Sequence, residues 1–465
     1  MLRQSSMTHH RPHITFLLLA LASIGLASAL VGCDSPSEPG FDWTGLLTDE
    51  ELRTEEDPNA PDENLQWAEW VEANNIPIRS LEAGNYSDLL SLRPYFQEAR
   101  IVQLGENGHG AAEFSKVKVR TIRFLHEVMG FSVVAFESSI FECYYGDNRA
   151  SSLPAEETMM DSVSDVWHCE EVLPLFKYLK ERASLGKNLH LAGLDTRISS
   201  RKGVAHRPDF FKGLLATVNE DFADHVYELD HEFIERHLDA GYIPDNRDSL
   251  IAEYGAIADS IGQHEGEIAA AFPENPEVAR VARQVALTVI KRIDELYLMS
   301  LGQEDQAFET RDQGMAENLE FFLNELYPGE KIVVWAHNAH VCHDYKSIPE
   351  RNRVNMGGRL HELHRPELYT VGFYMYRGSA ATNERETLEV PAAQSGSLES
   401  ILYRTRRKYC FIDMLGQSRG DGNSWMFETV GSNEWDRGGL SFAPKDQYDG
   451  ILFVDTVTPP TYVVE

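Results

Sequence analysis

From Trp67 onward, short apolar runs alternate with stretches of helical periodicity, and this alternation restricts the chain to few architectures. The run Ala99–Leu104 predicts a strand, and the apolar residues at helical spacing after it predict a helix that ends at Gly130. The run Phe131–Phe136 predicts a second strand. A strand, a helix and a strand at this spacing form a βαβ unit, so the two strands are expected to be parallel.

The same pattern continues towards the C-terminus. Between about residues 208 and 302 the sequence is almost wholly helical, which indicates a helical insertion or subdomain. We therefore expect residues 65–465 to form an α/β domain with a central, largely parallel or mixed sheet flanked by helices. Five further apolar runs predict strands of this sheet: Leu189–Leu194, Lys331–Ala336, Glu367–Met375, Tyr409–Asp413 and Gly450–Val454.

Acidic and imidazole side chains follow four of the predicted strands at their carboxyl ends. Open α/β sheets bind ligands at that edge. A single such residue is often only a helix cap or a solvated loop residue, and for Asp195 this alternative stays open. Four strands that end alike favour one cleft for acid–base chemistry or a metal. The candidate residues are Glu106, His109, Glu137, Asp195, His337 and His340.

The first 64 residues carry targeting signals rather than a folded domain. A start rich in Arg and His precedes an apolar stretch that ends in Leu30-Val31-Gly32-Cys33, which resembles the bacterial lipobox. We expect residues 1–32 to be a lipoprotein signal peptide, Cys33 to carry the lipid, and residues 33–64 to form an acidic, disordered tether. An uncleaved anchor is the alternative, because about 19 apolar residues can just span a bilayer. Either interpretation places a membrane-anchored protein outside the cytoplasm, in the periplasm or at the cell surface.

The chain carries a formal net charge of −32, from 74 acidic and 42 basic residues among 465. This charge argues against nucleic acid as a partner, because the phosphate backbone repels it. We expect a small-molecule partner and a monomeric protein. In an oxidising compartment the four cysteines beyond Cys33 allow three disulfide pairings, of which Cys143 with Cys169 is preferred. Isolated buried thiols are the alternative, for these two and for Cys342 and Cys410.

Two short motifs do not support their usual functions. The segment Gly105–Gly110 lacks the G-x-G-x-x-G spacing of dinucleotide-binding loops and is followed by no Walker lysine, so phosphate binding is only weakly indicated. The segment Gly416–Gly420 matches the G-x-S-x-G pattern of a nucleophile elbow, which requires a His further along the chain. The last His is His364, so we reject a serine hydrolase of that type.

Several ordered segments of the chain resemble the erythromycin esterase family. They are Leu104–Phe114, the strand end at Glu137, Arg311–Asn318 and Trp335–Val341. The resemblance covers most of the chain after about residue 70, and it implies an α/β core with a helical portion. It also implies hydrolysis of an ester, which is the macrolide lactone in the namesake enzymes. His109 would be the general base that activates water.

The resemblance further implies that Glu106, Glu137, His337 and His340 line the site. Where some members of the family carry Arg, this chain has Lys118, which is also cationic but cannot form a bidentate fork. Ester hydrolysis needs a base for water and donors for the developing oxyanion, and imidazole suits the first task at neutral pH. Glu106 would orient the imidazole of His109. His337 and His340 would donate to the oxyanion or protonate the leaving alcohol, and Lys118 is a second cationic candidate for this role. Glu137 would position water.

Two alternatives remain open at this stage. The same two Glu and three His residues are an adequate set of ligands for Zn²⁺ or Mn²⁺, which would generate hydroxide without a protein base. Their spacing matches no recognised metal signature, and we expect the neighbouring His343 to be a surface residue. The second alternative is an envelope protein that binds its ligand without turning it over. Grouped ionisable residues cost desolvation energy, which favours catalysis over binding.

Overall fold

The computed structural model describes residues 42–54, 64–238, 241–434 and 438–463. The predicted signal peptide, Cys33 and most of the predicted tether lie outside these residues. Within them, no helix is both long and apolar enough to cross a membrane.

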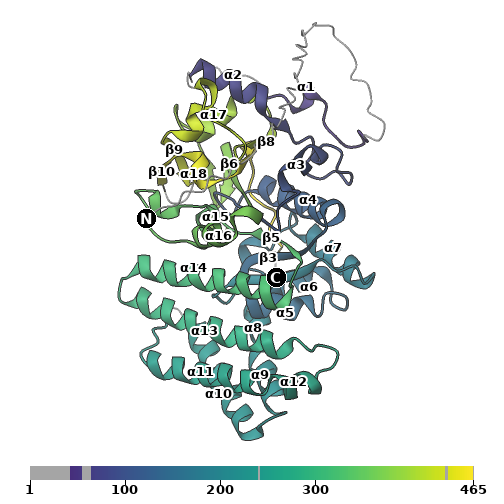
Figure 1. Cartoon of the computed structure of the whole chain (residues 1–465), viewed down its shortest axis with the longest axis vertical. Coiled ribbons are helices and arrows are strands. Elements are labelled where there is room, and N and C mark those ends of the chain that lie inside the picture. Colours follow the sequence, from purple (N-terminus) through teal and green to yellow (C-terminus); the bar gives the residue numbers. More distant parts are fainter. Residues whose placement is uncertain (1–41, 55–63, 239–240, 435–437, 464–465) are drawn as a thin grey trace, which may run out of the picture. The chain divides into compact units, whose positions relative to one another are not determined.

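A mixed sheet of nine strands forms the centre of the structure (Figure 1). Its strands follow one another in the order β1 (Ile76–Pro77), β8 (Tyr409–Asp413), β11 (Gly450–Val457), β6 (Leu368–Ala381), β2 (Ile101–Leu104), β5 (Lys331–Trp335), β3 (Phe131–Ser139) and β4 (His190–Asp195). The ninth strand, β7 (Thr387–Val390), pairs with β6. All neighbours from β11 to β4 are parallel, whereas β8, β1 and β7 pair antiparallel. The predicted α/β class with a largely parallel or mixed sheet is therefore confirmed.

Helices cover both faces of this sheet, which explains why its strands are continuously apolar. Val102 of β2 points into one core together with residues of α4 (Ala112–Met129) and α7 (Leu173–Ser184). The preceding residue, Ile101, points into the opposite core with residues of α13 (Val278–Ser300) and α14 (Glu304–Phe321). Because successive side chains of a strand point to opposite faces of the sheet, each strand contributes side chains to two separate cores.

A helical segment separates β4 from β5. It consists of α8 (Arg201–Val204), α9 (Arg207–Leu215), α10 (Glu220–His237), α11 (Arg247–Gln263), α12 (Glu265–Ala271), α13 and α14. Helix α14 packs on β4 and on α13, and α13 packs in turn on α11, so α14 lies between the sheet and the other helices (Figure 1). A buried ion pair between Arg207 and Asp230, joined by the hydroxyl of Tyr254, links α9, α10 and α11.

The remaining elements are mostly short. Before β2 lie α1 (Asp49–Leu52), α2 (Leu65–Asn74) and α3 (Arg93–Phe96), and between β3 and α7 lie α5 (Ile140–Asp147) and α6 (Ala155–Ser162). After β5 come α15 (Asn338–Val341), α16 (Met356–His364), α17 (Leu398–Tyr403) and α18 (Pro444–Gln447), together with a hairpin of β9 (Val430–Glu434) and β10 (Gly438–Phe442).

The preferred disulfide between Cys143 and Cys169 is not formed. Both thiols are free and buried, as is that of Cys410, which is the arrangement of the alternative, and Cys342 is buried as well. Burial raises the pKa of Cys169 to about 12, so its thiol stays protonated and packs as a small apolar group.

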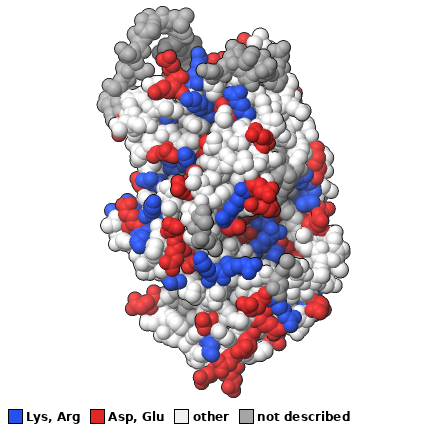
Figure 2. All heavy atoms as spheres, turned by 180° about the vertical axis from the view of Figure 1, so that it is seen from behind, with Lys and Arg blue, Asp and Glu red and all other residues white. Residues whose placement is uncertain are grey.

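Acidic side chains are not spread evenly over the surface. On the face drawn in Figure 2, Asp and Glu gather at the lower end, where Figure 1 shows α9, α10 and α12. Elsewhere on this face Lys and Arg are interspersed with acidic residues.

Candidate active site

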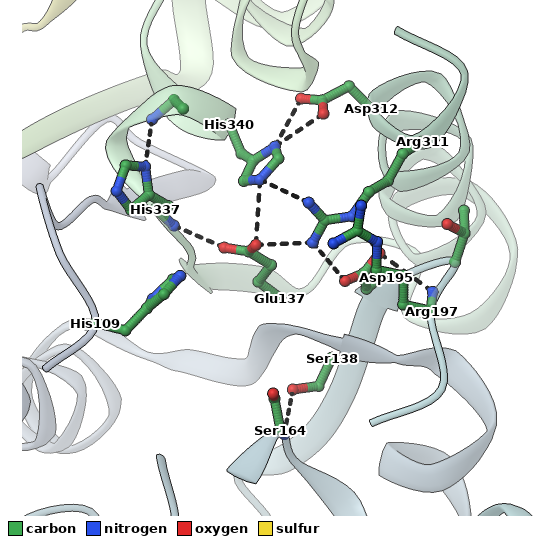
Figure 3. Close-up of polar contacts among 12 residues, drawn as sticks. His109, Glu137, Ser138, Ser164, Asp195, Arg197, Arg311, Asp312, His337 and His340 are labelled. Atoms are coloured by element: carbon green, nitrogen blue, oxygen red, sulfur yellow. Dashed lines mark hydrogen bonds and ion pairs between the residues drawn. The ribbon is translucent and has the colours of Figure 1, made fainter. Parts of the chain in front are cut away.

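The structure brings the polar residues at the strand ends together at one edge of the sheet (Figure 3). Glu106 and His109 follow β2, Glu137 lies near the end of β3, and Asp195 is the last residue of β4. His337 and His340 follow β5, which runs between β2 and β3. Parallel strands end at the same edge of the sheet, so residues that are far apart in the sequence become neighbours. Glu137, for example, is about 200 positions from His337 and His340.

The turn after β2 is held so closely that two of its glycines, Gly105 and Gly110, cannot be replaced without movement. A Cβ on Gly105 would lie 2.0 Å from Oδ1 of Asn338, and one on Gly110 would lie 1.9 Å from the carbonyl oxygen of Ala381. The backbone N–H of Asn338 donates to the carbonyl of Glu106 at 2.8 Å. These contacts fix the segment that carries His109 against the segment that carries His337 and His340.

Glu106 orients His109. Its Oε1 lies 2.7 Å from Nδ1 of His109 and accepts a longer bond from Nε1 of Trp167, while its Oε2 accepts from Nζ of Lys118 at 2.6 Å. Burial alone would raise the pKa of Glu106, but Lys118 and His109 overcome it and lower the pKa, so the group is a carboxylate. A carboxylate can only accept, so Nδ1 of His109 carries the hydrogen and Nε2 is left as the basic nitrogen.

Lys118 lies in the interior, on the far side of Glu106 from His109. Its side chain has no solvent exposure and packs against the rings of Trp335 and Phe373. Burial lowers the pKa of Lys118 to about 8, although Glu106 opposes the fall, and the ammonium therefore stays largely protonated at pH 7. In this position Lys118 acts on Glu106 and, through it, on His109, whose side chain is 13% exposed against 1% for Glu106.

His337 is held in the opposite tautomer. It is the N-cap of α15, and its Nδ1 accepts a hydrogen bond from the backbone N–H of Ala339 at 3.0 Å. A backbone N–H can only donate, so the neutral ring carries its hydrogen on Nε2. The rings of His109 and His337 have centroids 5.2 Å apart. The two imidazoles thus place a basic nitrogen and a donor in one site (Figure 3).

His340 is an imidazolium at neutral pH. Its Nδ1 lies 2.8 Å from Oδ2 of Asp312, and its Nε2 lies 3.1 Å from Oε1 of Glu137. Burial would lower the pKa of His340, but Asp312 and Glu137 raise it to about 9. The ring of Phe308 stacks on the imidazole with centroids 5.4 Å apart. His340 is therefore a buried, fixed cation and not a group that titrates near pH 7.

An arginine joins the acids of β3 and β4. Arg311 of α14 donates to both oxygens of Asp195, at 2.8 and 2.6 Å, and Nη2 also donates to Oε1 of Glu137 at 2.8 Å. Burial would raise the pKa of both acids, but Arg311 lowers that of Asp195 to about 2, and His340 with Arg311 lowers that of Glu137 well below its usual value. Asp195 therefore belongs to the site, and the open alternative of a solvated loop residue does not hold, because it is buried.

Sequence reasoning assigned no role to Arg311, Asp312 and Trp167. Arg311 and Asp312 lie in one of the segments that resemble the family, so the signal was present without a role attached. Trp167 lies in a 3-10 helix, and no sequence pattern marked it. The expectation that His343 is a surface residue was wrong: its side chain is buried, because it packs against the ring of His361 and near Asp449.

The candidate metal ligands do not form a coordination shell. Both carboxylates are already held by cations, Glu106 by Lys118 and Glu137 by Arg311. His340 is held between the carboxylates of Asp312 and Glu137, and Nη1 of Arg311 lies 3.1 Å from its Nε2. Among the residues that the structure describes, no group of three or more His, Cys, Asp or Glu side chains is placed to hold a metal ion. We therefore derive no step through a metal.

The fold and the site define an α/β protein with a buried acid–base centre at the carboxyl edge of its sheet. The chain belongs to the erythromycin esterase family, whose model matches residues 126–457 and thus includes Glu137, His337 and His340. Membership in this family indicates a hydrolase that acts on a small molecule. The matched range begins after His109, whose position rests on the geometry given above.

Curated relatives and solved structures agree with this assignment. The chain is 29% identical to "Putative hydrolase YbfO" of Bacillus subtilis over 87% of this chain and 94% of that protein. It is 28% identical to erythromycin esterase type II of Escherichia coli, over 32% of this chain and 36% of that protein.

Two solved structures share the fold at low identity. A Bacillus cereus protein superimposes with a TM-score of 0.74 at 18% identity, covering 87% of this chain and all of that one. A histidine mutant of erythromycin esterase EreC in its open conformation gives 0.60 at 15% identity, covering 82% of this chain and 96% of that one.

Proposed function

We propose that the protein hydrolyses a carboxylic ester or lactone with water activated by His109. The observation that carries this proposal is the pair of contacts at Nδ1: that of His109 faces the carboxylate of Glu106, and that of His337 faces the backbone N–H of Ala339. These partners assign the two rings opposite tautomers. In this mechanism Nε2 of His109 takes a proton from water, and Nε2–H of His337 donates to the carbonyl oxygen of the substrate as it becomes an oxyanion.

The step balances without a cofactor. The oxygen of water attacks the ester carbon while His109 takes one proton, and the resulting oxyanion is held by His337. The tetrahedral intermediate then expels the alkoxide, which receives the proton from His109. The products are a carboxylic acid and an alcohol, and His109 returns to its starting state.

The charged groups around this pair hold it in place. Glu106 with Lys118 fixes the ring of His109, and Oε2 of Glu137 accepts from the backbone N–H of His337 at 2.8 Å. His340 and Arg311 keep Glu137 ionised and fixed. In this proposal Glu137 and His340 support the geometry of the reacting groups, and no net charge has to be moved into the site during the reaction.

The experiment is a panel of aryl esters, lactones and macrolides, tested with the purified protein and with His109→Ala. We expect at least one substrate to be hydrolysed, and the variant to lose at least about a hundredfold in kcat/KM. His225→Ala, which removes an exposed imidazole of α10, is the matched control and should keep full activity. Turnover of a panel substrate by folded His109→Ala at the wild-type rate would contradict the proposal. Binding without turnover would favour the non-catalytic alternative.

We also propose, from the sequence, that Cys33 is lipidated and that the protein is anchored to a membrane outside the cytoplasm. The support is the apolar stretch that ends in Leu30-Val31-Gly32-Cys33.

The macrolide lactone is a candidate substrate because of the family name and the partial match to the Escherichia coli enzyme.

A further inference from the structure

A pocket with a volume of about 520 Å³ opens beside α16 and α18. Four of its thirteen lining residues are Lys or Arg and two are His, whereas Lys and Arg make up only 42 of the 465 residues of the chain. The basic lining residues are His343, Lys346, Arg359, His361, Arg365 and Lys445. Three acidic residues also line it, Asp344, Glu362 and Asp446, and all three are exposed, so water screens their charge.

One buried nitrogen in this lining has no hydrogen-bond partner among the residues that the structure describes. Nε of Arg359, which always carries a hydrogen, has no acceptor. His343, by contrast, is paired: its Nε2 lies 3.4 Å from Oδ2 of Asp449, and Arg365 binds the other oxygen of Asp449 at 2.8 Å. An unsatisfied buried donor is costly, and an anionic ligand in the pocket would satisfy it.

Hydrogen bonds join α16, which forms one wall of this pocket, to α15, the helix that carries His340. Nδ2 of Asn355, the N-cap of α16, donates to the carbonyls of Ala339 and Cys342 at 2.9 and 2.8 Å. The backbone N–H of Met356 donates to Oδ1 of Asp312, the carboxylate that also holds His340. A Cβ on Gly357 would lie 2.2 Å from the carbonyl oxygen of Val341, so α16 and α15 touch backbone to backbone (Figure 1). A displacement of α16 would therefore also displace the carboxylate of Asp312.

We propose that this pocket binds a small oxyanion of the phosphate or carboxylate type, and that its occupancy alters turnover through α16 and Asp312. The Lys and Arg side chains supply the charge, and the unpaired Nε of Arg359 supplies a donor that is already in place. The binding half of the proposal is independent of the reaction. The coupling half rests on the proposed function.

Inorganic phosphate is the first probe, with sodium chloride at the same ionic strength as the reference. We expect 10 mM phosphate to raise the Tm of the protein by about 2 °C relative to chloride. Phosphate also stabilises proteins without a site, so the shift must depend on the pocket. Arg359→Ala and the exposed Lys346→Glu should each abolish it, whereas Arg236→Ala, on the exposed surface of α10, should retain it. A shift that is absent in the wild type, or equal in all four proteins, would overturn the proposal.

The coupling is tested by the rate of ester hydrolysis. Saturating phosphate should change kcat of the wild type by at least about twofold and leave kcat of Lys346→Glu unchanged. A phosphate-dependent Tm shift with no change in kcat would overturn the coupling and leave binding supported. A protein that hydrolyses no ester at all would count against the proposed function, while the Tm measurements would still decide the binding site.

Discussion

At the scale of single residues, the partners of each imidazole decide its chemistry. His109 meets a carboxylate, His337 meets a backbone N–H, and His340 meets two carboxylates. Three histidines thus become a base, a hydrogen-bond donor and a fixed cation, although their side chains are chemically identical. The sequence could place the three imidazoles at strand ends, but it could not assign these states, because the partners come from distant segments such as α14.

The buried pair of Lys118 and Glu106 can be separated from the chemistry it supports. Lys118→Met should destabilise the protein by about 3–5 kcal/mol, because it leaves the carboxylate of Glu106 buried without a counter-charge. Lys118→Met with Glu106→Leu should recover most of this stability while kcat/KM stays at least about tenfold low, because His109 is no longer oriented. Urea unfolding and ester hydrolysis measure the two effects. Full activity in the stable double variant would contradict a positioning role for the pair.

The raised pKa of His340 makes stability depend on pH. A group with a pKa of about 9 when folded and about 6.5 when unfolded adds stability that is complete below pH 6.5 and is lost as the pH rises through 9. The contribution is about 3 kcal/mol. Asp312→Asn should show a smaller loss of unfolding free energy between pH 6 and 9.5 than the wild type. The lowered pKa of Lys118 acts in the opposite direction but equally in both proteins. Parallel pH curves would show that Asp312 does not hold the proton on His340.

At the scale of elements, the apolar runs and the helix-ending Gly130 were enough to predict the core of the sheet. Strand β8 and helix α4 end where expected, and β3 extends past Phe136 to include Glu137. Strands β1 and β7 and the β9–β10 hairpin were not predicted. These strands are two to five residues long and lie at edges, where pairing depends on a neighbour and not on a long apolar pattern.

The turn after β2 gives an element-scale prediction. Gly110→Ala should lower kcat/KM at least about tenfold and reduce the Tm, because the new methyl would collide with the backbone of Ala381 and displace His109. Gly255→Ala is the control, since a Cβ at that position in α11 meets no atom within 4 Å and alanine favours a helix. It should keep activity and leave the Tm equal or slightly higher. Equal behaviour of the two variants would show that the turn is not held as described.

At the scale of the whole molecule, the proposed lipid anchor at Cys33 can be tested apart from the chemistry of the hydrolase domain. Cys33→Ser should move the protein from the membrane fraction to the soluble fraction of an expressing bacterium, because the acylated residue is lost. Fractionation followed by detection of the protein measures this. Cys342→Ser, which alters a buried thiol, is the control and should stay with the membrane. An unchanged distribution of Cys33→Ser would support the uncleaved anchor instead.

The central claim is that His109 and His337 act together on one substrate. The direct measurement is kcat/KM on a single ester for the wild type, His109→Ala, His337→Ala and the double variant. Residues that act as a unit are strongly non-additive, so the double variant should be about as slow as His109→Ala alone. Losses that simply multiply in the double variant would mean that the two imidazoles contribute independently, and would contradict the shared site.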